Sequence, residues 1–178
     1  MVDLGTGRSQ KGAGMKFSLS TCAALLLLSG TSEAQQRYGA WAVTETDYGH
    51  IASTTNDSGA TLSKVCFNED QQCLWAVEVA NDCDDGTQTP AIVTSAAGGY
   101  HITMHCSNNK SGKVNVVSPY DAMQAAIAVN GMVGFAFPLQ DGQYRVVRFS
   151  LSGSTSAAAA VERAVVREAK ESTRDLSL

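Results

Sequence analysis

The sequence lacks the short motifs that accompany the common redox and acyl-transfer mechanisms. No two cysteines are separated by two residues, so the Cys-x-x-Cys motif of disulfide oxidoreductases is absent. No serine lies at the centre of a Gly-x-Ser-x-Gly motif, which marks many serine hydrolases. These absences favour an interaction protein over an enzyme, and we expect no bound cofactor.

The sequence also lacks clusters of basic residues. Three of the 13 basic residues and two of the 17 acidic residues precede residue 35, so residues 35–178 carry a net charge of −5. An acidic surface repels nucleic acid and anionic membranes. The expected partner is therefore a protein or a small molecule.

Long apolar runs are absent from the body of the chain. The one such run, at 17–28, follows Lys16 and precedes a small-residue cleavage site at 32–34, in the order of a secretory signal peptide. The run is too short to span a bilayer as a stop-transfer helix. We expect residues 1–34 to be an N-terminal extension with a signal peptide. The mature protein is then periplasmic or secreted, with no membrane span.

The rest of the chain has the length of one domain. We expect a single β-rich domain at 35–170 and a polar tail at 171–178, without internal repeats. The sequence leaves open whether translation starts at Met1 or at Met15.

All cysteines outside the predicted signal peptide lie in one stretch of the domain. They are Cys66, Cys73, Cys83 and Cys106. Four cysteines in an exported domain predict two structural disulfides, although spacing alone cannot choose among the three possible pairings. If the strands of this stretch form an up-and-down meander, Cys66–Cys73 and Cys83–Cys106 each join one end of the sheet. We therefore expect these two bonds.

Alternating apolar residues and turn signals predict short strands through most of the domain. The predicted strands cover 38–43, 62–67, 73–79, 90–95, 100–106 and 113–117, and a hairpin joins 132–139 to 143–151. Residues 47–59 are polar and predict a loop or an irregular edge of the sheet. This pattern is typical of a mostly β fold, either an antiparallel sandwich or an open barrel.

Two further segments have helical features. A C-terminal helix is predicted from Ser154 or Ser156 to about Lys170, with an apolar stripe of alanine and valine. Residues 121–129 fit either a strand or a helix that begins with Asp121 as its cap.

Metal binding is the main alternative for the cysteine stretch. On a strand, His101 and His105 share one face, from which Cys106 points away, and zinc sites use closer pairs of ligands. The acidic turn at 82–86 lacks the distal glutamate of a calcium-binding loop. We therefore expect no metal site.

Two other functions stay open as alternatives. A periplasmic hydrolase would use His50 or His101 as a base beside a carboxylate, although a solvated loop histidine is the simpler interpretation of His50. A small-ligand-binding protein would use a groove lined by Trp41, Trp75 and Tyr100, although aromatic residues in strands usually pack in the core.

Several short segments occur together in this chain. They are the signal peptide, the Tyr-Gly-Ala-Trp-Ala-Val strand at 38–43, the paired cysteines, and the closing blocks at 133–139 and 147–153. In this combination the chain resembles the invasion-associated locus B family of bacterial periplasmic proteins. The resemblance implies a β-rich envelope protein associated with host-cell entry, without catalytic residues to carry over. Our prediction is an exported, disulfide-stabilised interaction module of unknown ligand, related to the envelope or to host interaction.

Overall fold

Period-two alternation of buried and exposed side chains produces ten strands in the part of the chain that the structure describes. The computed structural model describes residues 35–79, 83–109, 112–139 and 142–175, so the predicted signal peptide lies outside it. The strands are β1 (Gln36–Tyr38), β2 (Trp41–Thr46), β3 (Gly49–Thr55), β4 (Thr61–Phe67), β5 (Cys73–Glu78), β6 (Gln88–Ser95), β7 (Gly98–Asn109), β8 (Gly112–Ser118), β9 (Met132–Pro138) and β10 (Tyr144–Ser150). The helices are α1 (Tyr120–Ile127) and α2 (Ser154–Asp175).

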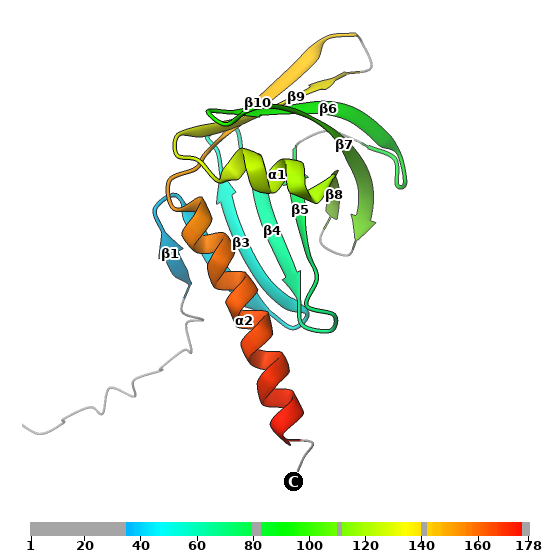
Figure 1. Ribbon diagram of the computed structural model, residues 1–178. Helices are drawn as coiled ribbons and strands as arrows, with labels where there is room; N and C mark the ends of the chain where they lie inside the picture. Colours follow the sequence, from blue (N-terminus) through cyan, green and yellow to red (C-terminus); the bar gives the residue numbers. More distant parts are fainter. Residues whose placement is uncertain (1–34, 80–82, 110–111, 140–141, 176–178) are drawn as a thin grey trace, which may run out of the picture. The chain divides into compact units, whose positions relative to one another are not determined.

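The strands form one open antiparallel sheet in the order β1-β2-β3-β4-β5-β8-β7-β6-β9-β10. Figure 1 shows α2 crossing β3 and β4, with α1 lying beside the later strands. The predicted mostly β fold with a C-terminal helix and two disulfides is confirmed. Neither helix in the described residues combines the length and the apolar composition needed to cross a membrane.

The hydrophobic core lies between the sheet and the two helices. Trp41, Leu62 and Trp75 come from the strands, and Met123 of α1 and Val161 of α2 pack against them without any solvent exposure. Each such side chain contributes roughly 1.5–3 kcal/mol through burial. The apolar stripe of α2 therefore holds the helix on the sheet, and the helix continues five residues beyond the end that the sequence predicts.

The start of α2 is fixed against the first turn of the domain. The backbone N–H of Ala40 donates a hydrogen bond of 2.9 Å to the carbonyl oxygen of Ser152. Gly153 has φ +85°, and a Cβ atom there would lie 2.0 Å from the carbonyl oxygen of Tyr38. Only glycine fits this contact, because it tolerates the left-handed conformation and has no side chain to collide.

The prediction of a loop or an irregular edge at 47–59 is wrong, because this segment contains β3, which pairs with a strand on each side. His50, Ala52 and Thr54 are buried beneath α2, whereas Ile51 between them is only half-buried. The strand does alternate. Its inward residues are small or polar, however, so the hydrophobic contrast that reveals a strand in the sequence is weak.

Two other boundaries also differ from the prediction. The strand predicted at 38–43 is divided by a turn at 39–40 into β1 and β2. The segment 121–129, which fits both types of element, contains helix α1, but Asp121 is not its cap. The cap position belongs to Pro119, which makes no side-chain cap hydrogen bond, and Asp121 lies in the first turn.

The predicted meander is wrong in its strand order. β8 lies between β5 and β7, so β5 does not pair with β6. Strand β6 pairs instead with β7 and with β9. This long-range insertion brings a strand from beyond the cysteine stretch into the middle of the sheet. Local sequence patterns carry no signal for such an insertion.

Both predicted disulfides are nevertheless present. Cys66 and Cys73 are register partners across β4 and β5, with Cα atoms 4.1 Å apart. Cys83 and Cys106 have Cα atoms 6.0 Å apart. The segment after Cys83 reaches β7 through a backbone hydrogen bond of 2.9 Å from Gly86 to Cys106. The Cys83–Cys106 bond therefore follows from the β6–β7 hairpin, and it does not require the predicted meander.

Candidate functional site

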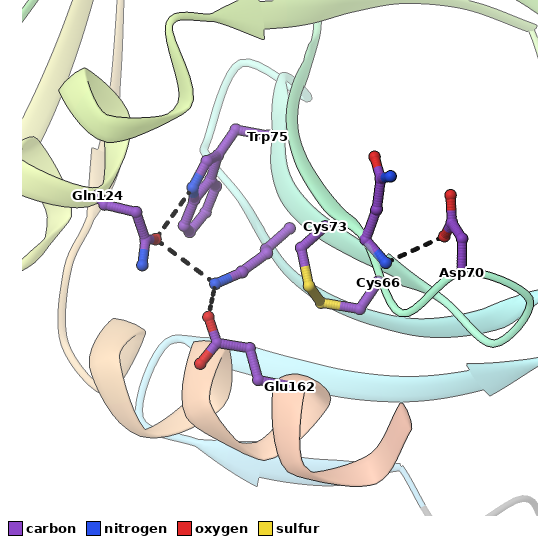
Figure 2. The surroundings of a disulfide bond; sticks show 8 residues. Cys66, Asp70, Cys73, Trp75, Gln124 and Glu162 are labelled. Carbon is purple, nitrogen blue, oxygen red and sulfur yellow. Dashed lines mark hydrogen bonds and ion pairs between the residues drawn. A yellow bond between two sulfur atoms is a disulfide. The ribbon is translucent and has the colours of Figure 1, made fainter. Parts of the chain in front are cut away.

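A lysine side chain is fully buried between the sheet and both helices. Lys64 of β4 has no exposed surface, and its Nζ lies 5.5 Å from the ring centre of Trp75 and 5.3 Å from that of Tyr120. The ammonium group forms an ion pair with Glu162 of α2 and a 3.5 Å hydrogen bond with Oε1 of Gln124 in α1. Figure 2 shows Gln124 and Glu162 reaching from the two helices towards Trp75 and the Cys66–Cys73 disulfide.

The partners of Lys64 compensate for the loss of its hydration. A buried ammonium group costs several kcal/mol unless it is paired and hydrogen-bonded, and the two aromatic faces add cation–π attraction. Trp75 donates from Nε1 to the same Gln124 oxygen at 3.1 Å. Through these contacts the buried Lys64 connects the sheet to α1 and α2.

His50, one of the two candidate bases, is also buried beneath α2. Its side chain is in β3, and its Nε2 lies 2.6 Å from Oε1 of Glu168. Glu45 of β2 is the register partner of His50, and one ligand atom from each of the three residues lies within 4.8 Å of the others. The interpretation of His50 as a solvated loop residue is therefore wrong.

The hydrolase alternative expects a histidine base beside a carboxylate, and His50 with Glu168 has this arrangement. A complete catalytic triad also needs a nucleophile hydrogen-bonded to the same histidine. Among the residues that the structure describes, His50 has a carboxylate partner but no hydroxyl or thiol partner. His105 has the opposite arrangement, since its Nε2 lies 2.8 Å from Oγ of Ser118 but no described carboxylate contacts it. His101 is exposed on β7. The structure thus divides the parts of a triad between two histidines.

The aromatic residues considered for a ligand groove do not form one. Trp41 and Trp75 are both fully buried, with ring centroids 6.2 Å apart in an edge-to-face arrangement. The hydroxyl of Tyr100 donates to the carbonyl oxygen of Ala97 in the adjacent turn at 3.3 Å. The two tryptophans therefore belong to the core.

The acidic turn has a structural role in the described residues. The Oδ1 atom of Asp85 accepts a hydrogen bond of 2.8 Å from the backbone N–H of Asn108. The carbonyl oxygen of Asp84 accepts from the backbone and the hydroxyl of Thr87. Asp82 lies outside the described residues. These hydrogen bonds hold the turn beside β7, and they occupy the Asp85 side chain and the Asp84 carbonyl oxygen.

The face of the sheet that points away from the helices carries an apolar groove of about 500 Å³. Ile51, Val65 and Leu74 are register partners across β3, β4 and β5, and each alternates with a residue that faces the helices. All three are half-buried. Glu78 and Lys113 are the charged residues that line the groove. The groove is therefore an uncovered apolar surface across the centre of the sheet.

A second cleft, of about 960 Å³, adjoins the groove and is acidic. Four carboxylate side chains line it, and none of its described lining residues is basic. They are Asp47, Glu69, Asp70 and Glu168. Tyr48 and Phe67 line both hollows, and their ring centroids lie 6.2 Å apart. Since Tyr48 is 51% exposed, an apolar surface continues directly into a negatively charged one.

This surface was not predicted from the sequence, although a signal for it exists. Strand β4 carries Leu62 on its inner face and Val65 and Phe67 on its outer face, so it is apolar on both sides. A strand with apolar residues on both faces is expected to have both faces covered by other structure. The weak hydrophobic contrast of β3 conceals the pairing of Ile51 with Val65.

The fold has a counterpart among solved structures. The crystal structure of invasion associated protein B from Bartonella henselae aligns with a TM-score of 0.53 and 14% identity, over 71% of this chain and 94% of that one. Neither a protein-family model nor a curated protein matches the sequence. At this identity the likeness concerns the fold alone. The resemblance predicted from the sequence is confirmed at that level, and this chain has the fold of invasion associated protein B.

Proposed function

We propose that this protein is an exported interaction module that binds a segment of a partner protein on the helix-free face of its sheet. Two disulfides in one small domain are typical of an oxidising compartment, which supports a periplasmic or secreted location. The signal-peptide pattern at 1–34 and the fold shared with invasion associated protein B support an envelope or host-interaction role.

The observation that carries the proposal is the continuity of the apolar groove with the acidic cleft. Exposed apolar patches on soluble proteins commonly mark binding sites, and charge complementarity selects the partner. The four carboxylates of the cleft therefore favour, as the occupant, a segment with apolar side chains next to lysine or arginine. The apolar part would lie over Ile51, Val65 and Leu74, and the basic part beyond Tyr48 and Phe67.

The experiment compares two fluorescent peptides that share one apolar half. One peptide continues with lysine and arginine, and the other continues with glutamate. Fluorescence anisotropy with the disulfide-bonded protein is expected to show binding of the basic peptide and at least about tenfold weaker binding of the acidic one. Equal affinities for the two peptides, or no binding of either, would contradict the proposal.

Matched variants locate the binding surface. Val65→Asp places a charge in the groove and should weaken binding of the basic peptide about tenfold or more, because a charge is costly beside buried apolar groups. Thr55→Asp adds the same charge on the same sheet face, at an exposed residue that does not line the groove, and should leave binding unchanged. Tyr48→Ser provides a second groove variant should Val65→Asp unfold.

Two other occupants of the groove have distinct outcomes. A volume of about 500 Å³ also suits a small apolar molecule, which would bind without regard to peptide charge. A second copy of this chain would appear in sedimentation as a dimer that Val65→Asp dissociates. Either result would replace the proposed partner.

A further inference from the structure

We infer that Glu45, His50 and Glu168 form a binding site for a divalent transition-metal ion. The three residues come from β2, β3 and α2, and the chain brings them together across 118 residues between His50 and Glu168. The site shares one residue with the proposed peptide-binding surface, because Glu168 also lines the acidic cleft, whereas Glu45 and His50 line neither the groove nor the cleft.

The geometry of the three residues suits an ion after small side-chain movements. One ligand atom of each lies within 4.8 Å of the other two, and the His50 Nε2 to Glu168 Oε1 distance is 2.6 Å. Zinc–nitrogen and zinc–oxygen bonds of about 2.0–2.2 Å place tetrahedral ligands roughly 3.4 Å apart. The hydrogen bond between His50 and Glu168 would therefore open as the ion replaces the shared proton, while Glu45 closes in.

The two glutamate side chains can move towards an ion, while His50 is held in place. His50 is 4% exposed and fixed within β3, so it supplies a rigid ligand. Glu45 is exposed and the side chain of Glu168 is 28% exposed, so both carboxylates can turn. Glu168 also lines the acidic cleft, which provides an entry path and water for the remaining coordination position.

The donor set selects the class of metal. One imidazole with two carboxylates gives mixed nitrogen and oxygen ligands, which favour zinc and its neighbours over calcium or magnesium. Three protein ligands with an open position are typical of accessible zinc sites. The two carboxylates contribute two negative charges, which a divalent ion balances. A bound ion would also join α2 to β2 and β3.

The experiment titrates tag-free, disulfide-bonded protein with Zn²⁺ by calorimetry and follows the imidazole nitrogens by long-range ¹H–¹⁵N NMR. We expect one saturable ion per chain, a shift of the His50 Nε2 resonance, and a higher melting temperature with Zn²⁺. His50→Gln and Glu168→Gln should each weaken binding about tenfold or more. His101→Gln and Glu171→Gln, at exposed positions on β7 and α2, are the matched controls and should bind as the parent does.

Three results would overturn the inference. They are the absence of saturable Zn²⁺ binding, an affinity that His50→Gln and Glu168→Gln leave unchanged, and an equal loss in the His101→Gln control. If His50→Gln fails to fold, Glu45→Gln replaces it, since Glu45 is an exposed residue whose change leaves the core intact. Loss of Zn²⁺ binding in Glu45→Gln supports the site, and full retention contradicts it. The Val65→Asp variant should keep its Zn²⁺ affinity, which separates this site from the peptide-binding groove.

Discussion

The rings of Tyr48 and Phe67 lie 6.2 Å apart, tilted by 37°, where the apolar groove meets the acidic cleft. Tyr48 precedes β3 and Phe67 ends β4, so the pairing of these two strands brings the rings together. Tyr48 stays half in solvent. This pair joins the apolar groove on the helix-free face to an acidic cleft that α2 also lines, and the proposed function depends on that combination.

The acidic cleft should control the rate of association with a basic peptide. Replacing Asp47 and Glu69 together by lysine should lower the association rate about tenfold at low salt, with a smaller effect at physiological ionic strength. Stopped-flow fluorescence at two salt concentrations measures this change. Asp57→Lys together with Asp84→Lys, at two exposed positions that do not line the cleft, makes the same change in net charge and is the control. Equal slowing in the control would show that net charge alone is responsible.

The buried lysine should respond differently to the loss of its charge and to the loss of its partner. Lys64→Met should leave the free energy of unfolding within about 1 kcal/mol, because an apolar isostere often replaces a buried ion pair without loss. Glu162→Ala should lower it by about 1.5–3 kcal/mol, because Lys64 loses its charged hydrogen bond. Urea denaturation measures both.

Two features make this comparison informative. The Glu162 side chain is 44% exposed, so water hydrates it after Lys64→Met. Glu171→Ala, on an exposed part of α2, should change the free energy of unfolding by less than about 0.5 kcal/mol. A larger loss for Lys64→Met than for Glu162→Ala would show that the ion pair itself stabilises the fold.

Both disulfides should stabilise the domain, and the longer loop should contribute more. Their sequence separations are 7 and 23 residues. The chain-entropy relation gives about 2.5 kcal/mol for Cys66–Cys73 and about 3.5 kcal/mol for Cys83–Cys106. Paired Cys→Ala variants in urea denaturation test this order. An unchanged midpoint in either paired variant would mean that its bond does not constrain the unfolded chain.

The contact of Gly153 with the first turn should be sensitive to a single methyl group. Gly153→Ala should cost about 2–4 kcal/mol, from the left-handed conformation and the collision with Tyr38 together. Gly142 has φ +80° with nothing within 4 Å of its Cβ position, so Gly142→Ala should show the conformational cost alone, about 1–2 kcal/mol. Thermal unfolding of the two variants measures the difference. Equal losses would contradict the close approach.

The sequence predicted the fold well where its signals were local. The hairpin predicted from 132–139 and 143–151 is present as β9 and β10, with Val133 and Phe135 facing Phe149 and Val147 in register. The disulfide pairing also depends on neighbouring hairpins and was predicted correctly. Strand β3 was not predicted, because its buried and exposed residues differ little in hydrophobicity.

The candidate sites depend on contacts that no local pattern records. Glu168 meets His50 only because α2 returns over the first strands, and Gln124 and Glu162 meet Lys64 from two separate helices. Lys64 shares a strand face with Leu62 and Cys66, and the two helices bury its charge. Such residues become recognisable only after the packing of distant elements is known.

Methyl NMR of the isoleucine, leucine and valine side chains tests the proposed binding face most directly. On addition of the basic peptide, we predict that the resonances of Ile51, Val65 and Leu74 shift in a saturable manner. Ile92 and Val146, which are 40% and 48% exposed on other strands, should stay unchanged. Shifts at Ile92 and Val146 with none at Val65 would contradict the account.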